Sequence, residues 1–327
     1  MIVFPSCYCR SARPRGAGPA RMPNPCWGGR IGGPGPFLGR GLAWLAIGCL
    51  VSVAGPAAAG SPTAAEVIEA AVTQLAYGPS LNAEVRVRTQ AAGEQTVASG
   101  NYVQAGGGSG RQRYELRSVV AGGPAVIVQC SDGRLAWTRR QIADNVELRR
   151  VELGRLPDQV QDRAEIVSAV GPAPSSRPAR VPPRLRVLGL VELLDNIAAD
   201  FELTVRTGTL RGAPVLILSG PLRETARQRV REAADGTIPQ DLPTEVWVAL
   251  SPTLAQPALF PLRIEYRQPD GSESGRLVTA VEVLSIKLQP ADDRLFLYDS
   301  NELDVDLVNE TDRYIRRFAG TAGVTRR

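Results

Sequence analysis

Hydrophobic and polar residues alternate along much of the chain from residue 81 onward. In Leu81–Thr89 the apolar side chains of Leu81, Ala83, Val85 and Val87 stand at every second position, with polar or charged residues between them. A period of two is typical of a strand that has one buried and one solvent-facing side. We therefore expect further strands at 95–104, 111–119, 125–129, 135–137, 146–153, 201–209, 214–218, 244–250, 259–267 and 275–288.

Two segments instead repeat apolar residues at helical spacing. The first begins at Thr63, which has the spacing of a capping box with Glu66, and it ends before Gly78-Pro79. The second covers 187–201 and has two sides of opposite character. Its apolar side consists of Val187, Leu190, Val191, Leu194, Ile197, Ala198 and Phe201, and its polar side of Glu192, Asp195, Asn196 and Asp200. We expect the first helix to pack on the sheet, and the second either to pack there or to serve as a movable lid.

Polar or proline-rich stretches interrupt the pattern at three places. Residues 154–186 include a Pro- and Arg-rich stretch, and residues 221–242 include an Arg-rich helix or excursion. Because too few strands precede the first stretch to close a cavity, we interpret both as insertions within one domain over 60–310. The segment 311–327 is polar and is expected to form a short helix with a loose tail.

Several short motifs follow one another in a recognisable order. Arg113-Tyr114-Glu115 lies in one expected strand, Ser131-Asp132-Gly133 forms a hairpin turn, and Trp137 follows in the returning strand. After the last long strand comes Pro290-Ala291-Asp292-Asp293-Arg294-Leu295-Phe296. With a helix before the strands, this order resembles that of the periplasmic lipoprotein carriers LolA and LolB, and the resemblance covers most of the chain after residue 60.

The resemblance implies a fold and a ligand. Proteins of that family have a strongly curved antiparallel sheet, an incomplete barrel, with helices over its concave apolar face, so the expected fold class is α+β, mainly β. The expected ligands are acyl chains of lipids or lipoproteins. Their binding needs no cofactor, because each CH₂ removed from water contributes ~0.8 kcal/mol to the free energy of binding. The candidate cavity residues are Val85, Val87, Tyr114, Leu116, Trp137, Leu190, Leu194, Leu262, Ile264 and Tyr266. For each of them the alternative is an ordinary filled core.

The resemblance also concerns two single positions. In the family a Phe at the position of Phe296 seals the last edge of the sheet. Carriers usually also have an Arg-Pro pair before the aromatic strand, whose Arg helps to control the opening of the cavity. Here Gly106–Gly110 precedes Arg111 and no Pro follows it, so we do not transfer the gating role.

The first 59 residues differ from the rest in charge and hydropathy. They contain six Arg and no Asp or Glu, and an apolar run over 41–54 precedes Ala57-Ala58-Ala59. A basic region, a short apolar region and a small-residue site are typical of a secretory signal. We expect a signal peptide over 1–59 that is cleaved after Ala59, and a periplasmic or extracytoplasmic mature protein. Translation from Met22 and acylation of Cys49 are the alternatives.

Export changes the meaning of the charge and of the cysteines. The whole chain has 38 Lys and Arg against 33 Asp and Glu, and without the six Arg of the leader the balance is 32 against 33. The basic character therefore belongs to the leader, and we expect no nucleic-acid partner. Four of the five cysteines also lie in the leader, so Cys130 has no internal disulfide partner and the domain must be held by its core.

Residues suited to catalysis are scarce. The chain has no His, which excludes Ser-His-Asp and Cys-His catalysis and His-ligated metal sites. The remaining candidates for metal or acid/base chemistry are the carboxylates of Asp292, Asp293, Asp304 and Asp306. They stand in turn-like sequence without a recognisable ligand spacing. We expect no enzymatic activity, no metal and no cofactor.

Two classes of function remain. The first is a lipid- or lipoprotein-binding protein, expected to be a monomer that contacts a membrane transiently. The second is an envelope sensor or protein-interaction domain on the same scaffold, since envelope regulators of sigma factors share this fold and bind protein partners. Bound lipid in the purified protein would favour the first, and a stable complex without lipid would favour the second.

Overall fold

The computed structural model describes the compact unit that follows Ser61. The described residues are 62–91, 93–120, 123–156, 181–234, 236–239, 241–252, 254–255, 257–269, 275–298 and 305–321. The expected signal peptide over 1–59, the acylation candidate Cys49 and the carboxylate of Asp304 lie outside them, as does most of the 154–186 insertion.

Twelve strands, four α-helices and three short 3-10 turns make up the described residues. The strands are β1 (Leu81–Ala91), β2 (Glu94–Gln104), β3 (Arg111–Val120), β4 (Gly123–Asp132), β5 (Leu135–Ile142), β6 (Asn145–Glu152), β7 (Thr204–Leu210), β8 (Ala213–Pro221), β9 (Glu245–Leu250), β10 (Pro261–Gln268), β11 (Arg276–Leu288) and β12 (Leu307–Asn309). The helices are α1 (Ala64–Tyr77), α3 (Gly189–Asp200), α4 (Glu224–Ala233) and α5 (Thr311–Thr321), and the turns are η1 (Leu153–Arg155), η2 (Pro183–Arg186) and η3 (Asp293–Phe296). The eleven expected strands are confirmed with shifts at their ends, and β12 is additional.

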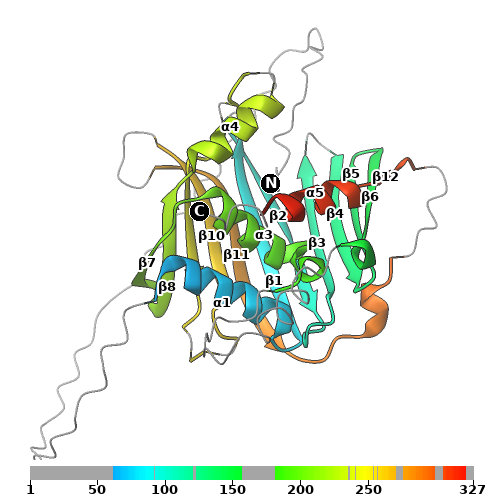
Figure 1. Ribbon diagram of the computed structural model, residues 1–327, viewed down its shortest axis with the longest axis horizontal. Helices are drawn as coiled ribbons and strands as arrows, with labels where there is room; N and C mark the ends of the chain where they lie inside the picture. The colour runs from blue at the N-terminus through cyan, green and yellow to red at the C-terminus, as the bar shows by residue number, and fades with distance from the viewer. Residues whose placement is uncertain are drawn as a thin grey trace, which may run out of the picture. The chain divides into compact units, whose positions relative to one another are not determined.

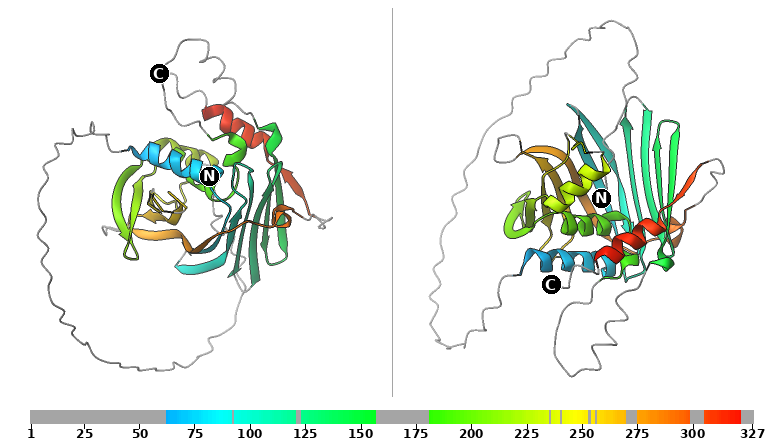
Figure 2. Two further views of the ribbon diagram at one scale, coloured as in Figure 1. Left: turned by 90° about the horizontal axis from the view of Figure 1, so that it is seen from below. Right: turned by 45° about the horizontal axis from the view of Figure 1, so that its top comes forward.

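All twelve strands form one open, curved sheet. Their order is β12-β6-β5-β4-β3-β2-β1-β11-β10-β9-β8-β7. The long strands pair antiparallel, whereas β12 pairs parallel with β6. The sheet bends strongly, yet its end strands β12 and β7 do not pair with each other, so the barrel stays open (Figure 1, Figure 2). The expected fold class, a mainly β chain built on an incomplete antiparallel barrel, is thereby confirmed.

The concave face of the sheet is apolar and carries the main core. On β1 the side chains of Leu81, Ala83, Val85 and Val87 are at most 4% exposed and belong to this core. Helices α1 and α3 lie over this face and pack against each other (Figure 1). Since full burial of a Val or Leu side chain contributes roughly 1.5–3 kcal/mol, the alternation along β1 is enough to fix which side of the sheet faces the helices.

Helix α1 begins and ends where the sequence predicts. The hydroxyl oxygen of Thr63 accepts a hydrogen bond from the backbone N–H of Glu66 at 3.3 Å, and Glu66 Oε2 accepts one from the backbone N–H of Thr63 at 2.8 Å. The bonds from the Thr63 backbone and side chain hold the pKa of Glu66 below its ordinary value. At the other end, a side chain on Gly78 would place its Cβ 2.1 Å from the carbonyl oxygen of Gln74, so glycine fits the stop of the helix.

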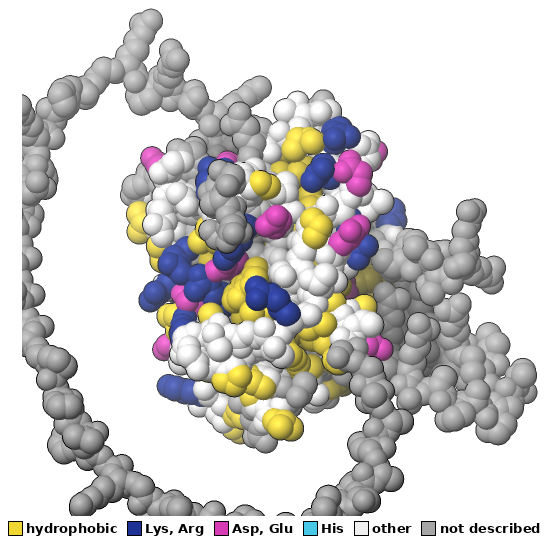
Figure 3. Space-filling view, turned by 90° about the vertical axis from the view of Figure 1, so that its left-hand side faces the viewer, with side chains coloured by type: hydrophobic (Ala, Val, Ile, Leu, Met, Phe, Trp, Pro, Cys, Tyr) yellow, Lys and Arg dark blue, Asp and Glu magenta, His cyan; other side chains and the backbone are white. Residues whose placement is uncertain are grey.

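Arginine and glutamate side chains cover the convex face of the sheet. Glu282 on β11 is 6% exposed and forms ion pairs with Arg88, Arg211 and Arg263. Burial raises the pKa of Glu282, but the hydrogen bond from Arg211 and the charges of Arg211, Arg263 and Arg88 outweigh burial, so its pKa lies below the ordinary value. On the side of the sheet that ends in β7 and β8, Lys and Arg side chains gather beside fewer Asp and Glu (Figure 3).

We expect Glu282→Gln to destabilise the protein by about 1 kcal/mol at pH 7, less than the ~3–5 kcal/mol of a fully buried pair because the arginines are partly exposed. A carboxylate with a lowered folded pKa stabilises the protein above its unfolded pKa, and that contribution disappears as pH falls through the folded pKa. The difference between variant and wild type, measured by urea unfolding, should therefore shrink from pH 7 toward pH 3. The exposed Glu84→Gln is the control, and an undiminished difference at pH 3 would contradict the assignment.

The chain after β11 crosses the convex face. Turn η3 packs on β3 and β4, where Phe296 is 1% exposed. The thiol of Cys130 donates to the backbone oxygen of Phe296 at 3.0 Å, and the guanidinium of Arg111 lies 5.7 Å from the Phe296 ring centre. The expectation that Phe296 seals the last edge of the sheet is therefore wrong, because β3 and β4 are interior strands and the edges are β7 and β12.

The chain then returns to the concave side and forms α5. Tyr314 and Phe318 of this helix are buried in a second core cluster, separate from the main core. Their partners are Ala136, Val151, Leu153, Leu156, Val187 and Leu188. Figure 2 shows α5 beside the strands of the β3–β6 half of the sheet. The expected short helix in 311–327 is present as α5. It packs on the domain because two aromatic residues four positions apart give an otherwise charged helix one apolar side.

Candidate functional site

Nine of the ten candidate cavity residues meet at the main core, seven of them buried in it and two, Leu262 and Tyr266, partly buried against it. They come from β1, β3, α3 and β10. The nine are Val85, Val87, Tyr114, Leu116, Leu190, Leu194, Leu262, Ile264 and Tyr266. The tenth, Trp137, lies elsewhere and is described below. Alternation predicts that these residues lie close together in space. That they line a ligand cavity stays a prediction.

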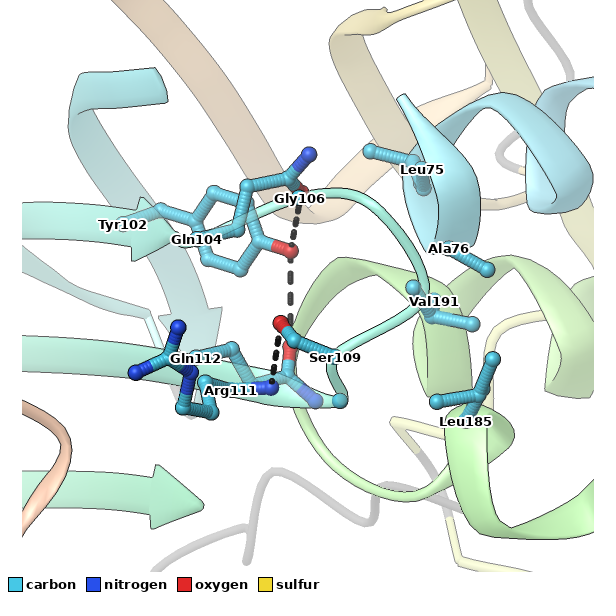
Figure 4. Close-up of a pocket in the computed structure, with 11 residues that line it drawn as sticks. Leu75, Ala76, Tyr102, Gln104, Gly106, Ser109, Arg111, Gln112, Leu185 and Val191 are labelled. Carbon is cyan, nitrogen blue, oxygen red and sulfur yellow. Dashed lines mark hydrogen bonds between the residues drawn. The ribbon is translucent and has the colours of Figure 1, made fainter. Parts of the chain in front are cut away.

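Several of these residues are fully or almost fully buried. Val85, Leu190 and Ile264 are each 1% exposed, and Leu194 is fully buried. A cavity of about 20 Å³, lined by none of the nine, lies between α1, the β2–β3 connection and the start of α3 (Figure 4). A single water needs roughly 10–15 Å³ measured in this way. This cavity therefore has room for a water molecule but not for an acyl chain.

Polar side chains stand at the edge of this cavity. The hydroxyl of Tyr102 donates to Gln104 Oε1 at 2.9 Å and lies 3.4 Å from Gln112 Oε1 (Figure 4). Burial raises the pKa of Tyr102 far above its ordinary value, so the hydroxyl stays protonated and acts as a donor. The two glutamines are 4% and 5% exposed. Neither glutamine is among the candidate cavity residues, because apolar residues alone mark the expected inward positions of these strands.

Gln112 connects this polar cluster to the start of α3. Its Nε2 donates to the backbone oxygens of Val187 and Leu188 at 2.7 and 3.2 Å. The next residue, Gly189, has a φ of +61°, and a Cβ there would lie 2.4 Å from Gln112 Oε1. Glycine is therefore required at the first position of α3 both by the backbone conformation and by the close approach of Gln112.

A buried arginine links α1 to α3. The side chain of Arg186, on η2, is 5% exposed. It forms ion pairs with Asp195 on α3 and with Glu69 on α1, the latter at 2.5 Å, and its Nε donates to the backbone oxygen of Val181 at 2.8 Å. One guanidinium thus joins α1 to the start and the middle of the segment that carries α3.

A second arginine links α3 to α5. Glu192 is 5% exposed, and its Oε1 accepts from the hydroxyl of Tyr314 at 2.9 Å and from Arg317 at 2.8 Å. Arg317 also binds Asp195 at 2.7 Å, which joins the two arginines through one carboxylate. Burial, and then the charge of Glu192, raise the pKa of Tyr314 well above its ordinary value, so its hydroxyl remains a donor.

These contacts correct the expected surface of α3. The polar side of this helix was predicted from spacing alone, which points Glu192 and Asn196 away from the sheet, but both are less than 10% exposed. Glu192 is buried because Tyr314 and Arg317 of α5 cover the side of α3 that the sheet does not. The result is a layer of α1, α3 and α5 held together by ion pairs above an apolar face.

Trp137 faces the convex side of the sheet. Its neighbour on β5, Ala136, is in the second core cluster with α5, and alternation places Trp137 on the opposite face. There its ring stacks on Tyr298 with 5.1 Å between ring centres, and the guanidinium of Arg150 lies 5.9 Å from the ring. The structure therefore does not bring Trp137 to the other candidate cavity residues.

Two of the candidate carboxylates after β11, Asp292 and Asp293, have local roles. Asp292 accepts from the backbone N–H of Arg294 at 3.0 Å and so caps η3, and Asp293 binds Arg111 at 2.5 Å. Among the described residues no group of three or more His, Cys, Asp or Glu is arranged to hold a metal ion. In the same part of the chain, none of the helices has both the length and the apolar character that a membrane span requires.

Comparison with known proteins yields distant structural likenesses. No protein-family model matches the chain, and no curated protein matches it. An uncharacterised conserved protein from Thermus thermophilus is 10% identical, with a TM-score of 0.37, over 75% of this chain and 97% of that one. The complex of MucA and MucB from Pseudomonas aeruginosa is 14% identical, with a TM-score of 0.35, over 72% of this chain and 61% of that one. A LolA superfamily protein from Nitrosomonas europaea is 13% identical, with a TM-score of 0.26, over 73% of this chain and 99% of that one. At these scores the likenesses carry no argument about what this chain binds.

Proposed function

We propose that this chain is an exported, non-catalytic binding protein that recognises a partner protein through its curved-sheet scaffold. The observation that carries the proposal is the filled concave face. Leu194 is 0% exposed there, and the adjoining cavity measures about 20 Å³. Because the described residues of this face are closely packed and the cavity near α3 is too small for an acyl chain, we infer that recognition takes place at the surface.

Export to the periplasm or another extracytoplasmic space is part of the proposal. It is supported by the basic, acid-free leader over 1–59 with its small-residue site. Absence of catalysis is supported by the chain having no His and by the local structural roles of Asp292 and Asp293.

Binding of acyl chains is the second candidate, and one observation favours it. Helix α3 covers the concave face with buried apolar side chains, among them Leu190 and Ile197. If α3 moved away, an acyl chain could replace these side chains and recover ~0.8 kcal/mol per CH₂. The ion pairs of Arg186 and Arg317 oppose this movement, which is why we place lipid second.

Mass spectrometry under native conditions separates the two candidates. The protein is exported by a bacterial host, purified without detergent and offered a fluorescent fatty acid. We expect an unliganded mass and no uptake of the probe. Near-stoichiometric acyl chains, identified after solvent extraction, would refute the protein-partner proposal and establish lipid binding.

A further inference from the structure

Helix α5 is a small element that packs separately from the main core. The apolar contacts of its two buried aromatic residues, Tyr314 and Phe318, lie in the second core cluster, and the hydroxyl of Tyr314 also donates to Glu192. We call the surface beneath them the α5 groove, and its floor consists of Ala136, Val151, Leu153, Leu156, Val187 and Leu188. Because the main core does not include α5, departure of the helix leaves that core intact.

The helix depends on the groove for its structure. It has 11 residues, fewer than the ~12–15 at which an isolated helix becomes marginally stable in water, and Gly320 lies in its last turn. The strand before it, β12, has only three residues, all exposed. Short elements with few buried contacts open locally at a lower free energy than the whole domain.

The groove specifies the chemistry of its occupant. Without α5, Glu192 would keep one of its three hydrogen bonds, from the backbone N–H of Leu188 at 2.8 Å, and lose those from Tyr314 and Arg317. Departure of α5 therefore leaves the Glu192 carboxylate without its cation, and an occupant that supplies a cation there regains a charge-assisted hydrogen bond. The open groove therefore favours an occupant that places an arginine at Glu192 and Asp195 and aromatic side chains on the apolar floor.

We propose that the α5 groove is the docking site of an amphipathic helix of the partner protein, and that α5 is its built-in competitor. This inference rests on the proposed function and adds the partner's chemistry: two aromatic residues four positions apart, with an arginine on the same side. Tyr314, Arg317 and Phe318 present that pattern in cis, and a partner helix with the same pattern would replace them.

A peptide of residues 309–321, labelled at its N-terminus, tests the proposal in trans. Fluorescence anisotropy compares its binding to the wild-type protein and to Arg317→Ala/Phe318→Ala, in which α5 is loosened. We expect binding at least ~10-fold tighter to the variant, because a tethered α5 competes at an effective concentration in the millimolar range. Hydrogen exchange of residues 311–321 reports whether α5 is released, and Arg317→Ala alone replaces the double variant if that unfolds.

The matched control is the same peptide with Arg317→Glu, which places an acid opposite Glu192 and is expected not to bind. Three results would overturn the proposal. The first is a released α5 without peptide binding, and the second is an α5 that stays protected from hydrogen exchange in both the single and the double variant. The third is binding of the control peptide as tight as that of the unmodified peptide. Lipid found by mass spectrometry would refute the proposed function but not peptide binding, so the two failures are distinguishable.

Discussion

Arg186→Ala is expected to lower the free energy of unfolding by about 3 kcal/mol, as for the loss of one partner from a buried ion pair. The guanidinium is 5% exposed, and its removal takes this cation from Glu69 and leaves Asp195, 16% exposed, with Arg317 as its remaining ion-pair partner. The backbone oxygen of Val181 also loses its donor. Urea unfolding monitored by circular dichroism at pH 7 measures the change.

Arg184→Ala is the control for this experiment, because Arg184 lies on the same 3-10 turn but is exposed. It should change stability by no more than ~0.5 kcal/mol. Arg186→Lys should recover only part of the loss, since an ammonium cannot reach both carboxylates and the backbone oxygen in the geometry of a guanidinium. A fully stable Arg186→Ala would mean that the ion pairs do not hold the helix layer in place.

Leu194→Ala should cost about 2–5 kcal/mol and open an apolar cavity under α3. Leu194 is 0% exposed and contributes to the main core. An apolar cavity of sufficient size stays dry and binds small apolar molecules. We therefore expect the variant, but not the wild-type protein, to bind a small aromatic probe, as seen by calorimetry or by ligand-observed NMR.

Leu254→Ala provides the comparison, because Leu254 lies between β9 and β10 and is 97% exposed. Its replacement should leave stability within ~0.5 kcal/mol and create no probe site. Equal probe binding by the wild-type protein and Leu194→Ala would contradict the filled concave face, and with it the reason for preferring a protein partner over lipid.

Alternation predicted the strands well because each long strand has one face against the helices and one in water. The buried side of β1, Leu81 to Val87, shows why: a slip of one residue would expose all of its apolar side chains. The same reasoning fails where burial is created by a distant segment. Glu192 has the spacing of a solvent-facing residue, and only the contact with Tyr314 and Arg317 buries it.

Prediction of the candidate site likewise succeeded where the signal lies within one element and failed where it depends on residues distant in sequence. The nine cavity candidates that meet were read from periodicity within single elements. Trp137 was assigned to the wrong face of the sheet because β5 has few apolar residues. The residue that does face inward, Ala136, is small and easily overlooked. Gln104 and Gln112 were missed because a buried amide has no periodic signal. It is identified only once its partners, Tyr102 and the backbone oxygen of Val187, are known.

The pairing of β1 with β11 has a consequence for the order in which the chain folds. Leu81 on β1 pairs with Leu288 on β11. The two halves of the sheet can therefore join only after β11, the last long strand, is available. Contacts between residues so distant in sequence slow folding, since the entropy of loop closure is lost before the contact forms. A chain that crosses a membrane from its N-terminus would present β1 as an unpaired edge until β11 emerges, and an unpaired edge invites aggregation. Completion of this protein therefore depends on its last long strand, and a chain cut before Arg276 would leave β1 exposed as a template for wrong pairing.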